Sequence, residues 1–318
     1  RGNFVPGNSV PRYHILWGTG RGLVERFADL LSGHRNAGKL RYVFGCRVDD
    51  LVVDNSRVVG CRGVIEATGE ECEFRGDQTM VATGGINGNL QKVRDNWYWG
   101  DAPDDLLNGS HPFCDGAMHD VVERQGGVVT HLENMWNYAA GIPHPFPQFE
   151  GHGLSLIPCK SALWLDHTGK RIGPEPLITG FDTNDMCGRL SSMEKSWSWQ
   201  ILNWRIAARE FAISGSEHNP HIRDSRLLPF LKETLLGNHR LVRQMQEESD
   251  HFIVADRLPD LVEQMNALDG DNLIELDNVS YSIDTFDDNV RRGPGLWNDD
   301  QIRRIVHARA WRSDRIRT

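Results

Sequence analysis

The first 130 residues alternate short β-branched runs with segments of helical periodicity, and this alternation constrains the fold more than any other sequence feature. Leu23, Phe27 and Leu30 recur at the spacing of an amphipathic helix, with Gly20 and Gly22 in the loop expected before it. Four predicted strands follow, at residues 40–45, 47–55, 57–67 and 70–83. Alternating elements of both kinds predict an α/β domain.

A pair of glycines, Gly84 and Gly85, ends the last of these runs. Adjacent glycines after a strand indicate either a turn that needs φ above zero or a backbone that a ligand approaches closely. The segment NGNLQKVRDNW follows and starts with Asn87, which can cap a helix, and Asp115 and Gly116 then precede a further predicted helix. The apolar face of that helix carries Met118, Val121 and Val122. A plain turn and a ligand-facing turn both remain open from spacing alone.

The second half of the sequence has a different character. Residues 141–153 are rich in Pro, Gly and aromatic residues, and a predicted strand pair follows at 161–166 and 170–173. Helical patterns dominate from Ser196 onward, and the tryptophans of this half are expected mainly to pack it. A chain of 318 residues with 39% apolar content can bury more than one core. We therefore predict two domains, 1–131 and 132–318, in an α/β chain that is α+β overall.

Charge and composition limit the classes of partner that the protein can bind. The net charge of −9 argues against nucleic acid, because phosphate binding needs clustered Lys and Arg. The basic cluster at 303–317 is expected to be a solvated helix. No stretch approaches the roughly 18–20 apolar residues of a membrane span. Six cysteines without a CxxC pair predict free thiols in a reducing cytoplasm.

Residues 14–27 imitate a dinucleotide fingerprint. Their glycines stand at positions 18, 20 and 22, whereas the fingerprint places its third glycine three residues after the second, where this sequence has Leu23. The strand expected next is followed by Cys46 and Arg47 rather than by an acid. We therefore predict a helix-initiating turn here and no pyrophosphate loop.

Two further motifs suggest other chemistries. His144 and His152 flank Glu150, but no HExxH-like helix brings three ligands together, so we predict no metal site. The segment SGSEH at 214–218 lacks the G-x-S-x-G pattern of an α/β hydrolase. Neither motif competes with the glycine turn as the leading functional feature.

Several segments, in order along the chain, resemble one family: the flavin-dependent oxidoreductases that include the fumarate reductase and succinate dehydrogenase flavoproteins and the 3-ketosteroid dehydrogenases. The matching segments include RVDDLVVDNSRVVGCRGV, MVATGGINGN, CDGAMHDVVERQGGVV, LENMW and LDHTGKRI. A bacterial subgroup described as FAD-binding dehydrogenases is similar in GNSVPRYHILWGTG and EFAISGSEHNP. The resemblance implies a Rossmann-like FAD domain, a capping domain that closes over the flavin, and FAD as cofactor.

The resemblance also implies which residues contact the cofactor. The adenine contact through strand backbone falls at Val48, and the Asp-Gly pair that helps place the flavin falls at Asp115 and Gly116. The turn near the dinucleotide comprises Ala82, Thr83, Gly84 and Gly85. Small residues in such a turn let main-chain N–H groups approach a cofactor.

The family's phosphate loop and its C-terminal flavin segment have no counterpart in this sequence. We expect an internal segment of a longer protein, with part of the FAD site and weak or no FAD binding of its own. The alternative is a redox-silent ligand-binding module or an inactive truncated fragment.

The catalytic pattern differs from that of fumarate reductases. Tyr138 and Ala139 stand where those enzymes have His-Pro, and Arg171 is the one arginine near the position of their proton donor. Tyr138 is therefore the candidate acid/base group, with Trp136 as an apolar wall. The predicted reaction moves a hydride between FAD and a small or apolar, ketone-like or steroid-like molecule. The sequence does not identify the electron acceptor or donor.

Overall fold

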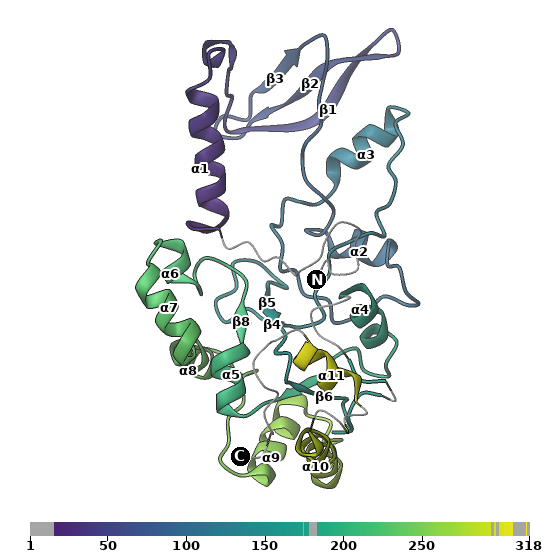
Figure 1. Ribbon diagram of the computed structural model, residues 1–318. Helices are drawn as coiled ribbons and strands as arrows, with labels where there is room; N and C mark the ends of the chain where they lie inside the picture. Colours follow the sequence, from purple (N-terminus) through teal and green to yellow (C-terminus); the bar gives the residue numbers. More distant parts are fainter. Residues whose placement is uncertain are drawn as a thin grey trace. The chain divides into compact units, whose positions relative to one another are not determined.

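The computed structural model describes residues 16–173, 175–177, 183–293, 296, 299–307 and 316. The chain forms two compact units (Figure 1). The N-terminal unit comprises Val24–Tyr98 and Ser110–Met135, and the C-terminal unit comprises Arg1–Leu23, Trp99–Gly109 and Trp136–Thr318. Helices mix with small antiparallel sheets, which is consistent with the predicted α/β class.

The N-terminal unit is built on the antiparallel sheet β1-β2-β3 (Cys46–Asp54, Arg57–Ile65 and Glu71–Arg75). The predicted hairpin is confirmed, because Asn55 (φ 47°) and Ser56 (φ 61°) form a two-residue turn between β1 and β2. Two successive left-handed residues match the twist of the paired strands. Gly63 is needed in β2, since a Cβ there would lie 1.9 Å from the Arg47 carbonyl oxygen.

Helix α3 (Ala117–Arg124) covers part of this sheet. Its predicted apolar face is confirmed: Met118 and Val121 are buried against Leu51 of β1. Val48 is among the partly buried residues that pack on this small cluster. Val58 and Cys61 of β2 also pack on it, so this N-terminal core is one helix face against strands β1 and β2.

Two predicted strands are wrong. Residues 40–45 form no strand, and the side chain of Phe44 is 85% exposed. The run 70–83 forms strand only as β3, which ends at Arg75, and Met80 is 91% exposed. Each segment has a single backbone bond to a neighbour, from the Glu66 N–H to the Gly45 carbonyl and from the Gly76 N–H to the Val59 carbonyl, both at 2.9 Å. One bond does not make the repeated ladder that a strand requires.

Helix α1 (Thr19–Ser32) confirms the predicted amphipathic helix and the helix-initiating turn, with Gly18 at φ 85° just before it. It begins earlier than expected, so Gly20 and Gly22 lie inside the helix rather than in a loop. All of its residues are at least partly exposed. Short helices η1 (Ala37–Lys39) and α2 (Leu90–Asp95) complete the N-terminal unit.

The C-terminal unit combines two small sheets with helices (Figure 1). One sheet has the order β4-β5-β8 (Gly141–Pro143, Gly153–Ile157 and Ala212–Ile213), and the other pairs β6 (Leu163–Leu165) with β7 (Trp199–Ile201). The helices are α4 (Thr183–Ser191), α5 (Trp204–Glu210), α6 (Pro220–Arg223), α7 (Leu227–Leu236), α8 (His239–Glu248), α9 (Leu258–Asp269), α10 (Leu276–Arg292) and α11 (Asp300–His307).

The core of this unit is continuous and surrounds β6. Leu163, Trp164 and Leu165 are fully buried, together with Phe286 and Ile283 of α10. The turn after β6 was predicted correctly, because the Asp166 N–H donates to the Lys170 carbonyl at 2.8 Å. The ladder partner of β6 is β7, however, inside a stretch that we expected to be helical.

Arg171 is tied into this core. Its guanidinium donates to Asp299 Oδ2 at 2.5 Å and to Gln301 Oε1 at 2.8 Å, and it lies over the ring of Phe286. These contacts assign Arg171 a structural role.

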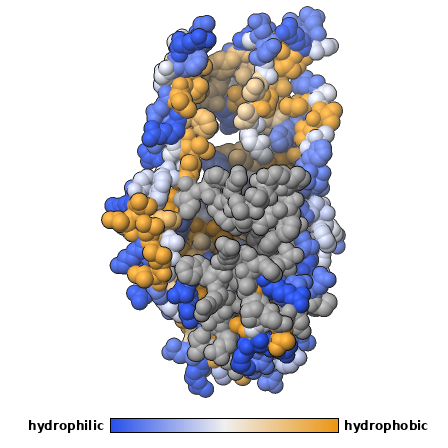
Figure 2. Space-filling view, in the orientation of Figure 1, coloured by the Kyte–Doolittle hydropathy of each residue, from blue (hydrophilic) through white to orange (hydrophobic). Residues whose placement is uncertain are grey.

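Surface character varies between helices. Figure 2 shows apolar side chains gathered over α7, where Leu228, Leu235 and Leu236 are largely exposed. None of the described helices combines the length and apolar character needed to cross a membrane. The part of the basic cluster at 308–315 and 317–318 lies outside the described residues, while α11 ends at His307.

Candidate flavin-binding site

The glycine turn lies beside the segment that starts α3, within the N-terminal unit. Gly84 adopts φ 87°, so the predicted need for a left-handed backbone is met at this residue. His119 Nε2 lies 3.1 Å from the Gly84 carbonyl oxygen, to which it can donate. A Cβ at Gly84 would lie 3.1 Å from Cys114 Sγ, which is closer than most Cβ contacts. The turn and the segment before α3 are therefore held together at close range.

A second glycine makes this approach possible. The Gly88 N–H donates to the Cys114 carbonyl at 2.8 Å, and a Cβ on Gly88 would lie 2.6 Å from the carbonyl oxygen of His111. The next residue, Asn89, caps α2, since its side chain accepts from the N–H groups of Gln91 and Lys92. The sequence predicts the cap at Asn87, the first residue of the NGN run, whereas the structure places it two residues later, at Asn89.

Asp115 and Gly116 shape the start of α3. Asp115 Oδ1 accepts a hydrogen bond from the Ala117 N–H at 2.9 Å, and Gly116 is in the left-handed conformation with φ 72°. A Cβ on Gly116 would lie 2.8 Å from Ile86 Cγ2. Glycine is thus required at 116 by both backbone conformation and space.

Lys92 joins the two helices of the site. Its ammonium donates to the Gly116 carbonyl at 2.9 Å and pairs with Asp120 at 2.5 Å. The Lys92 side chain is 22% exposed and that of Asp120 is 51% exposed, so this pair is partly shielded from water. It fixes α2 against the first turn of α3.

The structure therefore brings together the turn at Gly84 and the Asp115-Gly116 pair. Ala82, Thr83 and Gly85 continue the same turn and are exposed. Val48 lies elsewhere in the unit, at the apolar contact between β1 and α3. Sequence reasoning did not select Gly88, Lys92 or His119. Asn89 carried a capping signal, but nothing in the sequence marks the partners of Lys92 and His119, which lie more than twenty residues away.

These residues fit a dinucleotide cofactor. A Cβ added at Gly85 would meet nothing within 4 Å, and Gly85 does not need a left-handed φ. The described packing therefore does not explain why residue 85 is glycine. A ligand that approaches the main chain at this position would explain it, because a larger side chain would block the approach. The neighbouring start of α3 favours an anionic or electron-rich group.

The candidate catalytic residue belongs to the other compact unit. Tyr138 is 46% exposed and precedes β4, and Trp136 is 63% exposed. Two other tryptophans confirm the packing expectation, since Trp164 is 2% exposed and Trp199 packs against the C-terminal core.

The chain belongs to the FAD binding domain family, whose model matches residues 3–286. This match confirms the resemblance read from the sequence and identifies FAD as the cofactor of the family. The glycine turn and the start of α3 both lie inside the matched region.

Three relatives extend this result. The KsdD-like steroid dehydrogenase of Mycolicibacterium smegmatis is 36% identical over 98% of this chain and 58% of its own length. A KsdD-like steroid dehydrogenase of Mycobacterium tuberculosis is 35% identical over 98% of this chain and 56% of its own length. The NADH:acrylate oxidoreductase of Vibrio harveyi is 27% identical over 47% of this chain and 15% of its own length. The chain thus spans a little more than half the length of the steroid dehydrogenases that it matches.

Proposed function

We propose that this chain is part of a flavin-dependent oxidoreductase that transfers a hydride between FAD and a small or apolar organic substrate. The observation that carries the proposal is the pairing of Gly84 with the start of α3, where His119, Cys114 and Gly116 hold a small-residue turn open to a ligand. Membership of the FAD-binding family supports it. The steroid dehydrogenases among the relatives support a ketone-like or steroid-like substrate.

We propose a division of labour between the two regions. Residues 1–131 would form part of a Rossmann-like FAD domain, and residues 132–318 would form the capping domain. The division of the chain near Met135 into two compact units supports this boundary, although residues 1–23 and 99–109 belong to the second unit. The reducing cytoplasm remains our proposed compartment, since the six cysteines are free thiols.

In this account, the turn at Ala82–Gly85 and the pair Asp115-Gly116 hold FAD. When bound, FAD supplies the group that accepts or donates the hydride. The start of α3 would present backbone N–H groups to the electron-rich edge of the cofactor. Val48 would offer backbone to the adenine end.

Tyr138 would handle the proton. Its phenol oxygen Oη can donate a proton to a substrate carbonyl oxygen or accept one from a carbon next to it. The exposed indole of Trp136, two residues earlier, would exclude water from an apolar substrate.

The cofactor assignment can be tested with full-length protein. Gly84→Val places a side chain at φ 87° and against Cys114 Sγ, so we expect purified protein to lose bound flavin. Gly69→Val is the matched control, because Gly69 has φ 74° in the same unit but nothing within 4 Å of its Cβ position. Bound flavin is measured by absorbance after denaturation. Stoichiometric flavin in Gly84→Val would refute the assignment.

The role of Tyr138 has its own test. Tyr138→Phe keeps the ring and removes only the hydroxyl, so flavin binding should persist while kcat falls about 10²- to 10⁴-fold. The substrates to assay are 3-ketosteroids and short α,β-unsaturated acids. If kcat is unchanged with an active substrate, Tyr138 is not the proton-transfer group.

A further inference from the structure

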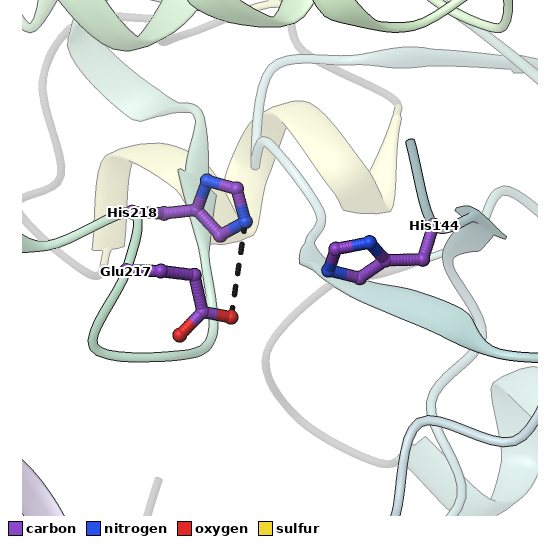
Figure 3. A group of neighbouring side chains, drawn as sticks. All are labelled: His144, Glu217 and His218. Carbon is purple, nitrogen blue, oxygen red and sulfur yellow. Dashed lines mark ion pairs between the residues drawn. The ribbon is translucent and has the colours of Figure 1, made fainter. Parts of the chain in front are cut away.

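A cluster in the C-terminal unit is not used by the proposed flavin chemistry. His144, Glu217 and His218 each offer one ligand atom, and these atoms lie within 4.8 Å of one another. In Figure 3 the three side chains point into the same space. We predicted no metal site from the sequence, because no HExxH-like helix brings three ligands together around the loop at 144–152.

Sheet topology explains why these residues meet. Strands β4 and β8 both pair antiparallel with β5, so they run in the same direction and end at the same edge of the sheet. His144 directly follows β4, and Glu217 and His218 follow β8 after a tight turn. The carboxyl ends of two parallel-running strands thus deliver the three residues to one place.

The backbone of the turn after β8 is well defined. Gly215 has φ 110°, which favours glycine, and its Cα lies close to the exposed Glu217 carboxylate. Asn219 Nδ2 donates to the carbonyls of Ile213 and Gly215, and Arg240 donates to the His218 carbonyl. The backbone on this side of the cluster is fixed before any ligand binds.

His218 is the decisive member. Its residue is 4% exposed, and among the described groups neither ring nitrogen has a hydrogen-bond partner. Nε2 faces the Glu217 carboxylate at 3.9 Å, which is too long for a hydrogen bond (Figure 3). Buried polar groups are normally paired. A buried imidazole aimed at a carboxylate and a second imidazole is typical of a metal ligand.

His144 is also held in place. Its backbone N–H donates to the His152 carbonyl at 2.9 Å, and the two rings stack with centroids 4.3 Å apart. Its Nδ1 accepts a hydrogen bond from the Phe146 N–H at 3.0 Å, which leaves Nε2 for the cluster. Coordination through Nε2 would move the ring proton to Nδ1 and release the Phe146 N–H. One neutral hydrogen bond is weak beside the binding of a transition metal by three ligands.

We propose that His144, Glu217 and His218 bind a zinc-like divalent ion through two imidazole Nε2 atoms and one carboxylate. Two nitrogens and one oxygen are a preferred ligand set of Zn²⁺, with a fourth position left for water. Zinc bonds of about 2.0–2.1 Å require ligand atoms about 3.3 Å apart, so the cluster must contract slightly. Glu217 can supply this movement, because its side chain is 58% exposed.

Of the three residues, His144 also lines an open depression of about 470 Å³ formed with Leu107, Pro143, Phe149 and His152. The ion would clamp the loop after β4 to the turn after β8. We expect the site to act independently of flavin binding, because its three residues belong to the C-terminal unit and the proposed flavin contacts belong to the N-terminal unit.

The test uses tag-free full-length protein stripped with EDTA and titrated with Zn²⁺ by calorimetry, with metal content measured after dialysis. We expect one Zn²⁺ per chain, and a loss of affinity of more than about 100-fold in His218→Ala and His144→Ala. Glu217→Gln preserves shape at an exposed position and should also weaken binding, which separates ligand loss from misfolding. His34→Ala, which removes an exposed imidazole of the N-terminal unit, should bind normally.

Two results would overturn the proposal. One is wild-type binding no tighter than millimolar, and the other is equal Zn²⁺ affinity in wild type and Glu217→Gln. Flavin content measured on the same samples should be unchanged in all variants, so failure here is distinguishable from failure of the flavin assignment.

Discussion

The two compact units are stabilised in different ways. The C-terminal unit has a continuous core in which β6 is fully buried among helices, whereas the N-terminal unit buries only Leu51, Met118 and Val121 together. The glycine turn lies in the unit with the smaller core. A weakly packed scaffold with an exposed small-residue turn is suited to a bound cofactor, because a ligand that binds the folded state adds stability. The contrast is between a unit with an extensive core and a unit that a bound cofactor would stabilise.

The largest expected effect is on the stability of the two cores. Phe286→Ala should destabilise the C-terminal unit by about 3–5 kcal/mol, because Phe286 is completely buried beside β6. Met118→Ala should cost the N-terminal unit about 2 kcal/mol, since fewer atoms surround it. Hydrogen exchange of β6 and of β1 reports the two units separately. If both variants lowered the protection of both strands equally, the units would not be energetically distinct.

A smaller loss of stability is expected when the contacts of Arg171 are removed. Arg171→Met leaves Asp299 unpaired at 8% side-chain exposure, so we expect a loss of about 3 kcal/mol in the free energy of unfolding. Arg291→Met is the control, because its pair with Asp288 is exposed and should contribute less than about 1 kcal/mol. Urea denaturation measures both. Equal losses of unfolding free energy in the two variants would contradict a structural role of Arg171 in the core of the C-terminal unit.

The smallest effect concerns cysteine reactivity and changes no stability. The Cys72 thiol, 2.9 Å from the Cys46 thiol, raises the pKa of Cys46 to about 11. Only the thiolate reacts with iodoacetamide, so labelling of Cys46 should be slow at pH 8 and rise about tenfold per pH unit toward pH 11.

The second arm uses Cys72→Ala, which removes the main cause of the raised pKa and should accelerate labelling of Cys46 at pH 8. Cys159 of the C-terminal core should stay unreactive in the same variant, because burial raises its pKa and it is 2% exposed. Peptide mass spectrometry follows both sites. Unchanged labelling of Cys46 in Cys72→Ala would contradict the assigned cause.

Local signals predicted part of the fold. The Asn55-Ser56 hairpin and the apolar face of α3 follow from propensity and spacing, while the asparagine cap of α2 lies two residues after the predicted Asn87. Residues 40–45 and 76–83 have strand-like composition but no strand, since pairing depends on a neighbour that composition does not reveal. Strand β7 was read as helix because an apolar tryptophan-rich run fits both periods.

The candidate site shows the same division. The glycine turn and Asp115-Gly116 were selected from their residue types and from family resemblance. The contacts that join them depend on Lys92 and His119, whose partners are distant in sequence. The His144, Glu217 and His218 cluster depends on strand direction in the β4-β5-β8 sheet, which spacing alone does not encode.

The most direct test of the central claim is Gly85→Val in the full-length protein. Gly85 needs no left-handed φ, and nothing lies within 4 Å of its Cβ position, so the substitution should leave the Tm of the flavin-free protein unchanged. If main-chain atoms of this turn contact FAD, the variant should lose most of its bound flavin, measured by absorbance against the Gly69→Val control. Stoichiometric flavin in Gly85→Val at an unchanged Tm would contradict the account.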